Sequence, residues 1–204
     1  CFNFRTDRCR EITEVLTQQD MESEGMKTID LYYVTMTRYD ESYSGVHVVY
    51  DKEVLKGTIG EVVSEHGLTQ LRIAETEKYP HVTFFFSGGR EDLFDGEDRV
   101  MIPSPKVATY DMQPEMSASQ IANELIGAIE GGEHSFIVTN FANADMVGHT
   151  ARRDALIRSV ETLDLESQRV FRVALQHGWR ILLTADHGNC DEMVNPNTGE
   201  PHTQ

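Results

Sequence analysis

The sequence predicts an α/β protein in which a mainly parallel sheet is flanked by helices. Residues 58–204 alternate short runs of β-branched and aromatic residues with longer segments of helical periodicity. Strands that alternate with crossover helices form a parallel sheet covered by those helices. Residues 1–50 show a smaller block of similar pattern, and the charged segment 51–57, which ends in glycine, is the best linker. We therefore expect the tail of one α/β domain, a hinge at 51–57 and a second α/β domain over 58–204.

The first block should contain one helix and two strands. Apolar residues recur at helical spacing over 8–18, which predicts a helix there. The segment 29–37 is rich in Tyr, Val and Thr and is typical of a strand, and 46–50 is a further short strand. A turn rich in Tyr, Ser and Gly separates the two.

Three helices are predicted in the second block. Thr58 and Glu61 have the spacing of a capping box, in which each side chain satisfies a free amide at the helix start. Ser117 and Gln120 repeat this spacing before a stripe of isoleucine and leucine. The longest helix should cover 152–177, because apolar residues are spaced there by threes and fours.

Four strands are predicted between and after these helices. They are 70–74, 99–102, 135–141 and 179–184. The last is nearly all apolar, which is typical of a strand that is buried on both faces. The run 82–86 is apolar on every side, so its pattern fits either a buried helix or a strand.

Composition excludes several classes of partner. Lys and Arg number 18 against 34 Asp and Glu, a formal net charge of −16, so nucleic acid and anionic membranes would be repelled. No run approaches the roughly 20 apolar residues of a membrane helix. Three cysteines without zinc-type spacing favour a reducing, cytoplasmic setting. The chain has no leader character and does not begin with Met, so we expect a piece of a longer polypeptide.

Two loops carry pairs of metal-ligating side chains. Asp145 and His149 follow one predicted strand, and Asp186 and His187 follow the next. Both loops leave the carboxyl ends of parallel strands, the edge at which open α/β sheets place ligands. His202 lies in a loop rich in Pro, Gly and Asn that could fold back over the same edge.

These side chains suit a divalent metal. Carboxylate oxygen and imidazole nitrogen without thiolate favour Mn²⁺, Zn²⁺ or Fe²⁺ over Ca²⁺. Five such groups exceed the needs of one catalytic ion, which suggests two. The alternative is that each Asp caps the next helix and each His lies on the surface. That alternative is the stronger for any one residue, whereas the two loops together favour metal.

Three cationic residues are candidates for binding an anion. Arg5 and Arg8 are three apart and could clamp a small dianion, although pairing with Asp7 and Glu11 explains them nearly as well. Lys78 follows a predicted strand, where it could contact a phosphate. Its acidic neighbours make an exposed ion pair the simpler account.

Several motifs resemble the cofactor-independent phosphoglycerate mutase family of alkaline-phosphatase-like metalloenzymes. They lie at 3–8, 70–82, 85–89, 140–149 and 184–189. The resemblance extends over essentially the whole chain. It implies a glycolytic and gluconeogenic isomerase that exchanges 2- and 3-phosphoglycerate through a phosphoserine intermediate, normally with two Mn²⁺ ions, although Mg²⁺, Zn²⁺ or another divalent ion could serve.

The resemblance also implies a role for each candidate residue. Asp145, His149 and His202 would bind one metal ion, and Asp186 and His187 the other. Arg5 and Arg8 match substrate-binding arginines of a transferase domain, whose C-terminal part would be residues 1–50. Lys78 matches a phosphoryl-contacting lysine of the phosphatase-like, metal-binding domain, here 58–204 and incomplete at both ends.

The resemblance places the nucleophilic serine upstream, so no catalytic nucleophile is assigned in this chain. The chain alone is expected to be inactive. A monomer that binds a small-molecule substrate, and neither nucleic acid nor membrane, is expected. Two alternatives remain: another enzyme of the same group, such as a phosphohydrolase or phosphopentomutase, or an inactive fragment with an interaction role.

Overall fold

The computed structural model describes residues 1–51, 55–190 and 192–202, without the side chains of Asp7 and Arg8. The chain divides into two compact units, Cys1–Val54 and Leu55–Gln204. The boundary falls within 51–57, the segment expected to be a hinge, of which 52–54 lie outside the described residues. Its action as a hinge stays a prediction.

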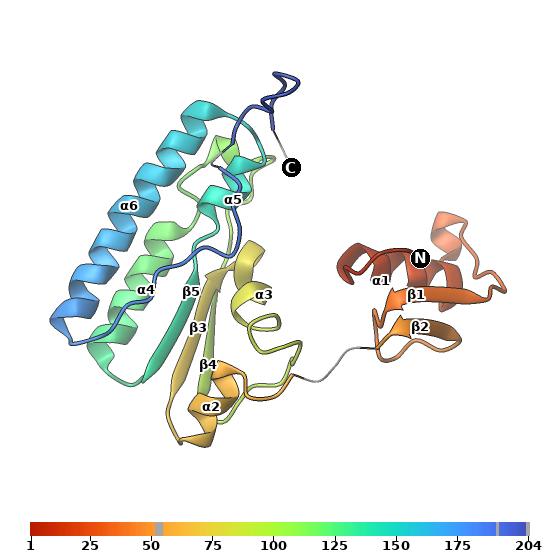
Figure 1. Cartoon of the computed structure of the whole chain (residues 1–204), viewed down its shortest axis with the longest axis horizontal. Coiled ribbons are helices and arrows are strands. Elements are labelled where there is room, and N and C mark those ends of the chain that lie inside the picture. Colours follow the sequence, from red (N-terminus) through yellow and green to blue (C-terminus); the bar gives the residue numbers. More distant parts are fainter. Residues whose placement is uncertain (52–54, 191, 203–204) are drawn as a thin grey trace. The chain divides into compact units, whose positions relative to one another are not determined.

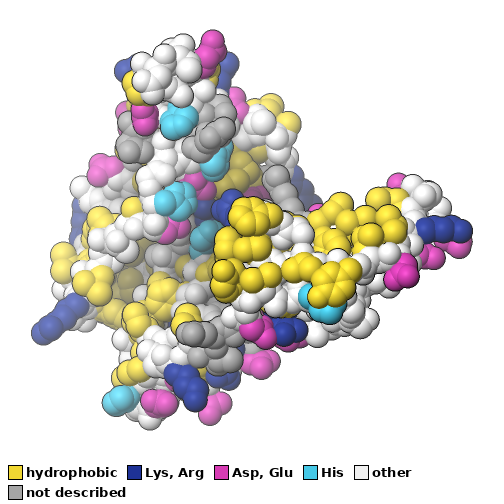
Figure 2. All heavy atoms as spheres, turned by 45° about the vertical axis from the view of Figure 1, so that its right-hand side comes forward, with side chains coloured by type: hydrophobic (Ala, Val, Ile, Leu, Met, Phe, Trp, Pro, Cys, Tyr) yellow, Lys and Arg dark blue, Asp and Glu magenta, His cyan; other side chains and the backbone are white. Residues whose placement is uncertain are grey.

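The first unit is a helix beside a pair of parallel strands. It contains α1 (Asp7–Thr17), the short 3-10 helix η1 (Glu22–Glu24), β1 (Tyr33–Thr37) and β2 (Val46–Tyr50). The expected strand 29–37 is shorter in the structure, because β2 begins at Val46 opposite Tyr33 and gives the preceding residues no partner. Figure 2 shows many hydrophobic side chains on the surface of this unit.

The second unit is built on a three-stranded parallel sheet. The central strand is β3 (Gln70–Glu75), with β4 (Glu97–Ile102) on one side and β5 (Phe136–Asn140) on the other. Arg72 at the middle of β3 lies opposite Arg99 of β4 and Val138 of β5. The predicted α/β class, with parallel strands flanked by helices, is confirmed.

Two long helices cover one face of this sheet. They are α4 (Ala118–Gly131) and α6 (Arg153–Gln176), and they lie side by side in Figure 1. Ile73 of β3 packs into a core with apolar side chains of both helices, which are Ile121, Ala122, Leu125, Ile129, Val170 and Ala174. The predicted stripes on these helices are therefore the faces that contact the sheet.

Shorter elements lie on the opposite face and at the carboxyl edge. The helices α2 (Ile59–Glu65) and α3 (Tyr79–Val82) are on the face away from α4 and α6 (Figure 1). The 3-10 helix η2 (Thr76–Lys78) directly follows β3, and α5 (Asn143–Gly148) follows β5. A further 3-10 helix, η3 (Tyr110–Met112), precedes α4. The ambiguous run 82–86 is neither a long helix nor a strand, since α3 ends at Val82 and turns follow.

The two expected capping boxes have different outcomes. At α2, the Thr58 hydroxyl accepts a hydrogen bond from the Glu61 amide at 3.4 Å, and the Glu61 carboxylate accepts one from the Gly57 amide at 2.5 Å. The prediction of a capping box at Ser117 is wrong, because the Ser117 side chain makes no capping hydrogen bond. Its hydroxyl instead donates to the carbonyl of Pro103 at 2.8 Å, because the chain leaving β4 passes beside the start of α4.

The predicted strand 179–184 is also wrong. The segment forms no strand, and Leu182 and Leu183 are 97% and 77% exposed. Only its beginning packs, where Trp179 and Ile181 contact the core between sheet and helices. An apolar run forms a buried strand only where a neighbouring strand can pair with its backbone and other elements cover both of its faces. The described residues provide neither for Leu182 and Leu183. No helix among the described residues is long and apolar enough to cross a bilayer.

Candidate metal centre

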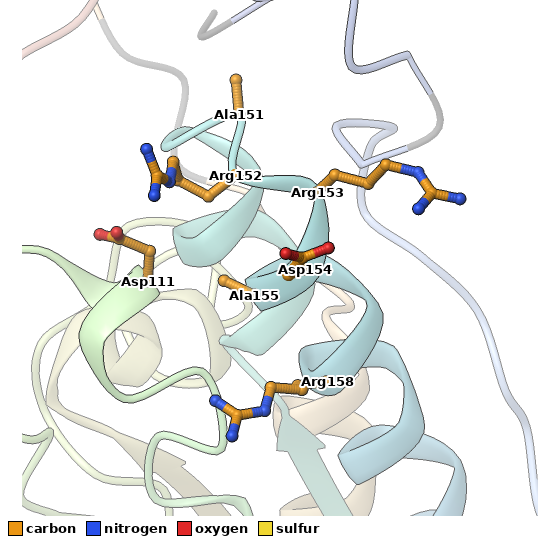
Figure 3. A pocket seen from close by; sticks show the side chains of 7 residues that line it. All are labelled: Asp111, Ala151, Arg152, Arg153, Asp154, Ala155 and Arg158. Carbon is orange, nitrogen blue, oxygen red and sulfur yellow. The ribbon is translucent and has the colours of Figure 1, made fainter.

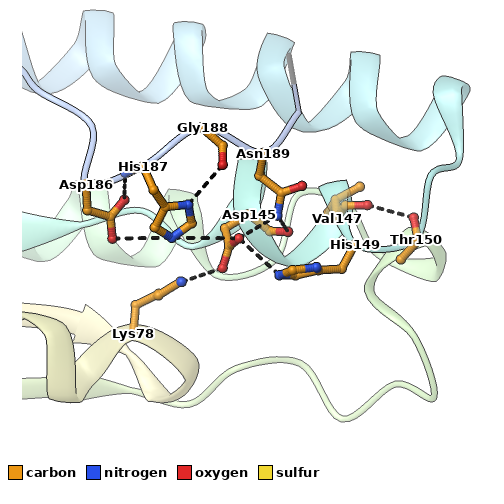
Figure 4. A network of polar contacts seen from close by, with 9 residues as sticks. All are labelled: Lys78, Asp145, Val147, His149, Thr150, Asp186, His187, Gly188 and Asn189. Carbon is orange, nitrogen blue, oxygen red and sulfur yellow. Dashed lines mark hydrogen bonds and ion pairs between the residues drawn. The ribbon is translucent and has the colours of Figure 1, made fainter. Parts of the chain in front are cut away.

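The carboxyl end of the central strand carries Lys78 into the interior. β3 ends at Glu75, and the single turn of η2 places Lys78 where only 5% of it is exposed. Its ammonium donates a hydrogen bond to Oδ2 of Asp145 on α5 (Figure 4). The exposed pairing with nearby acidic residues, which the sequence left open, is not what the structure shows.

Asp145 is the centre of this group of polar side chains. Besides Lys78, its carboxylate accepts a hydrogen bond from Asn189 Nδ2 to Oδ1 at 2.6 Å. The same Oδ1 lies 3.2 Å from Nε2 of His149 and 4.0 Å from Nε2 of His187. Figure 4 shows the four partners converging on this carboxylate: Lys78 from η2, His149 from the end of α5, and His187 and Asn189 from the second loop. His187 of the second loop thus lies near Asp145 of the first, although the second loop does not follow a strand of the sheet as predicted.

Two opposing effects set the pKa of Asp145. Burial by itself raises the pKa of the carboxyl, whereas the hydrogen bonds from Lys78 and Asn189 lower it. The Lys78 and His149 charges lower it further, and the net pKa lies below its ordinary value. The group is thus held as a carboxylate, the form that binds a metal ion.

The second loop presents its side chains more openly. His187 Nε2 lies 3.8 Å from Oδ2 of Asp186, and both side chains are about half exposed. His187 Nδ1 is hydrogen-bonded to the carbonyl of Gly188 at 3.2 Å. His202 is engaged elsewhere: its amide donates to the Met193 carbonyl at 2.9 Å and its Nδ1 is hydrogen-bonded to the Glu192 carbonyl at 3.2 Å.

Two residues hold the first loop in place. Asn143 is fully buried, and its Nδ2 donates to the carbonyls of Pro114 and Glu115 at 2.9 and 2.8 Å. At Gly148, an added Cβ would lie 2.7 Å from Oδ1 of Asn189. Glycine is therefore what lets Asn189 reach Asp145.

The donors fit a divalent metal chemically, although they are not gathered into a complete ligand set. They offer carboxylate oxygen and imidazole nitrogen, which suit a first-row divalent ion. Across the described ranges, no three His, Cys, Asp or Glu side chains are close enough to hold one. Oδ2 of Asp145 is taken by the Lys78 ammonium, which supplies positive charge there.

Neither Asn189 nor His81 is among the site residues that the sequence predicts. Asn189 lies in the predicted second loop, two residues after His187. Its side-chain amide, a hydrogen-bond donor next to two metal-ligand candidates, was the feature from which a role could have been predicted. His81 follows Lys78 by three residues, and burial lowers its pKa; Lys78 and His187 lower the pKa further, whereas Asp186 and Asp145 raise it. The arginine clamp is not tested: Arg5 is exposed, its amide bonding to Oδ1 of Asn3, and the Arg8 side chain lies outside the described residues.

A cavity of about 480 Å³ lies elsewhere, at the start of α6. It is lined by Asp111, Ala151, Arg152, Arg153, Asp154, Ala155 and Arg158 (Figure 3). None of the predicted site residues is among them. The polar centre around Asp145, rather than this cavity, is the candidate functional site.

The chain belongs to the metalloenzyme superfamily, whose family model matches residues 15–204. Within that class it is similar to 2,3-bisphosphoglycerate-independent phosphoglycerate mutases. The protein of Flavobacterium johnsoniae is 54% identical over 202 residues, and that of Bacteroides thetaiotaomicron is 52% identical over 203. Each match covers 99% of this chain but only 40% of the relative. The chain therefore spans about two fifths of the length of these curated relatives.

A solved structure supports the same relation. A crystal structure of Leishmania mexicana phosphoglycerate mutase at low cobalt concentration matches with a TM-score of 0.81 and 28% identity. The match covers 98% of this chain and 37% of that one. The similarity therefore includes the arrangement of the elements as well as the sequence.

Proposed function

We propose that this chain forms the metal-binding part, and the end of the substrate-binding part, of a phosphoglycerate mutase that interconverts 2- and 3-phosphoglycerate in cytoplasmic glycolysis and gluconeogenesis. The observation that carries the proposal is 54% identity along 99% of the chain to a protein with that name. The convergence of Lys78, His149, His187 and Asn189 on Asp145 supports it.

The proposed ligands divide between two ions, Mn²⁺ being the first choice. Asp145, His149 and His202 would hold one, and Asp186 and His187 would contribute to the other. Bound ions would supply positive charge to a phosphoryl group and lower the pKa of a hydroxyl nucleophile.

The cationic side chains of the protein would bind the substrate. Lys78 is positioned to donate to a phosphoryl oxygen once Asp145 exchanges the ammonium for a metal ion. Arg5 and Arg8 would hold the carboxylate and phosphate of the glycerate, for which guanidinium forks are suited. As P–O bonds break, negative charge on the phosphoryl oxygens would then be surrounded by donors.

A chimera tests this proposal directly. The region of the Flavobacterium johnsoniae relative that matches this chain would be replaced by the 204 residues, and conversion of 3-phosphoglycerate would be measured. We expect turnover, and a loss of about 10²-fold or more in Asp145→Asn. Asp164→Asn, on the exposed side of α6, is the matched control and should keep full activity.

The same assay separates the alternatives. A folded chimera that binds Mn²⁺ but does not interconvert the two phosphoglycerates would contradict the proposal. If that chimera instead released inorganic phosphate from phosphate monoesters, the phosphohydrolase alternative would be favoured.

A further inference from the structure

His81 borders the candidate metal centre without a role in it so far. It lies on α3, one helical turn after Lys78, and its ring contacts the ring of Phe85 at a centroid distance of 5.5 Å. The residue is half-buried. Its Nδ1 is enclosed and has no hydrogen-bond partner among the described residues.

Packing alone does not account for an imidazole at this position. The contact with Phe85 requires an aromatic ring, which a phenylalanine would supply equally well. An enclosed nitrogen without a partner has lost its hydration and gained no hydrogen bond in return. The polar ring therefore destabilises the ligand-free protein relative to an apolar ring of the same shape.

The ring lies within the electrostatic influence of the whole site. Burial lowers the pKa of His81, and the Lys78 and His187 charges lower it further, while Asp186 and Asp145 act in the opposite direction. The net pKa is below the ordinary value, so the imidazole is neutral at neutral pH. A neutral imidazole carries a single N–H, on either Nδ1 or Nε2.

We propose that His81 binds ligand at this site, its Nε2–H donating a hydrogen bond to a phosphoryl oxygen that Lys78 also contacts. This rests on the proposed function. Nε2 is the relevant nitrogen because protein encloses Nδ1, and a neutral ring can carry its proton on Nε2. A neutral donor beside the ammonium adds direction to phosphoryl binding without adding charge that would oppose the metal ions.

Inorganic phosphate is the probe, titrated into the 204-residue chain in excess Mg²⁺ and followed by NMR of backbone amides and of histidine ring nitrogens. We expect the ring of His81 to be the Nε2–H tautomer and its Nε2 signal to shift on binding. His81→Phe should weaken phosphate binding by about tenfold, yet unfold at the same or a higher temperature. His81→Gln, whose amide nitrogen lies near the position of Nε2, should retain affinity better than His81→Asn, whose amide lies near Nδ1.

The outcomes distinguish this inference from the proposed function. If Lys78→Met abolishes phosphate binding but His81→Phe leaves it unchanged, the role of His81 is overturned and the proposed function stands. A His81→Phe variant that unfolds at a lower temperature, with no recovery of affinity in His81→Gln, would assign the ring a structural role instead. A parent chain that does not bind phosphate would overturn the role of His81, whereas the proposed function is decided by the chimera assay.

Discussion

At the scale of single residues, the pairing of Lys78 with Asp145 joins two segments 67 positions apart in the chain. Both side chains are largely buried, with exposed fractions of 7% and 15%. Replacing a buried pair by apolar residues often costs little, whereas removing one partner leaves an uncompensated buried charge. Replacing either Lys78 or Asp145 alone should therefore destabilise the folded chain.

We predict that Lys78→Met destabilises the chain by about 3 kcal/mol, because Asp145 would lose its cationic partner. Urea unfolding measures this as a lower midpoint. The matched control is Lys106→Met, which removes an exposed ammonium and should change the free energy of unfolding by less than about 0.5 kcal/mol. Equal midpoints in the two variants would show that the ion pair contributes nothing.

Glu75, at the end of β3, is predicted to make stability depend on pH. It is fully buried, and burial raises its pKa, while a hydrogen bond from the Ser104 hydroxyl at 2.9 Å only partly offsets this. A carboxyl whose folded pKa is raised binds more protons when folded than when unfolded. Its contribution to stability therefore falls as pH rises from the ordinary value near 4.5 through the folded pKa.

The substitution Glu75→Gln should remove this fall and stabilise the chain at pH 7. Urea unfolding of parent and variant across pH 4 to 8 is the measurement. If the difference between parent and variant is constant over that range, Glu75 does not titrate abnormally.

The sequence could indicate candidate site residues but not how they pair. Asp145 and Asp186 were predicted together because two expected parallel strands would bring both loops to one edge, and His187 of the second loop does lie near Asp145 although 179–184 forms no strand. The partner of Lys78 could not be read, because local spacing favoured its acidic neighbours and only the tertiary fold places it beside Asp145. His202 stays a predicted ligand. In the structure its amide and its Nδ1 are hydrogen-bonded to the carbonyls of Met193 and Glu192, and no contact joins it to Asp145 among the described residues.

At the scale of elements, α2 is positioned by one glycine. A Cβ at Gly60 would lie 2.5 Å from Nη2 of Arg72 and 2.8 Å from Cε2 of Phe94. The fully buried guanidinium of Arg72 donates to Oε1 of Gln70 at 2.6 Å and lies 4.5 Å from the centre of the Phe86 ring. Gly60 gives α2 the close approach that encloses this side chain.

We predict that Gly60→Ala destabilises the chain by about 1–3 kcal/mol, because overpacking outweighs the better helix propensity of alanine. Gly127→Ala is the matched control. Gly127 lies inside α4 with nothing within 4 Å of an added Cβ, so alanine there should stabilise by about 0.5–1 kcal/mol. Thermal unfolding of both variants checks the opposite signs, and a stabilising Gly60→Ala would mean that α2 moves freely.

Helices were more predictable than strands for a physical reason. Helices α4 and α6 satisfy their own backbone hydrogen bonds, so a stripe such as Ile121, Leu125 and Ile129 is sufficient to locate one. A strand depends on its neighbours, and the run 179–184 has a strand composition without a strand's surroundings. The Ser117 hydroxyl likewise found a partner, Pro103, that no local pattern could reveal.

At the scale of the whole molecule, the 204-residue chain by itself should not interconvert phosphoglycerates. It spans 40% of the length of its curated relatives, and the resemblance places the nucleophilic serine outside the matched region. An assay for 2-phosphoglycerate formation, with the active chimera as positive control, checks this. Turnover by a preparation free of other mutases would require a nucleophile within these residues.

Metal binding by the chain should depend on the first loop more than on the second. We predict that Asp145→Ala and His149→Ala lose the tightest Mn²⁺ site by at least about tenfold in affinity, and that Asp186→Ala keeps it. The reason is that Asp145, His149 and His202 are one proposed ligand set within the chain, whereas Asp186 and His187 are fewer. Titration followed by electron paramagnetic resonance reports free Mn²⁺, and loss of the tightest site in Asp186→Ala would reverse the division of ligands.

The exposed pair Leu182 and Leu183 has a consequence for the behaviour of the chain in concentrated solution. A net charge of −16 keeps copies apart at low ionic strength, since like-charged molecules repel. At 0.1 M salt the Debye length is about 10 Å, so the repulsion is largely screened beyond that distance. Hydrophobic contact between exposed leucines is not screened by salt. Shelf life, clarity and recovery on concentration should therefore be set by ionic strength, with turbidity appearing first in high-salt buffers.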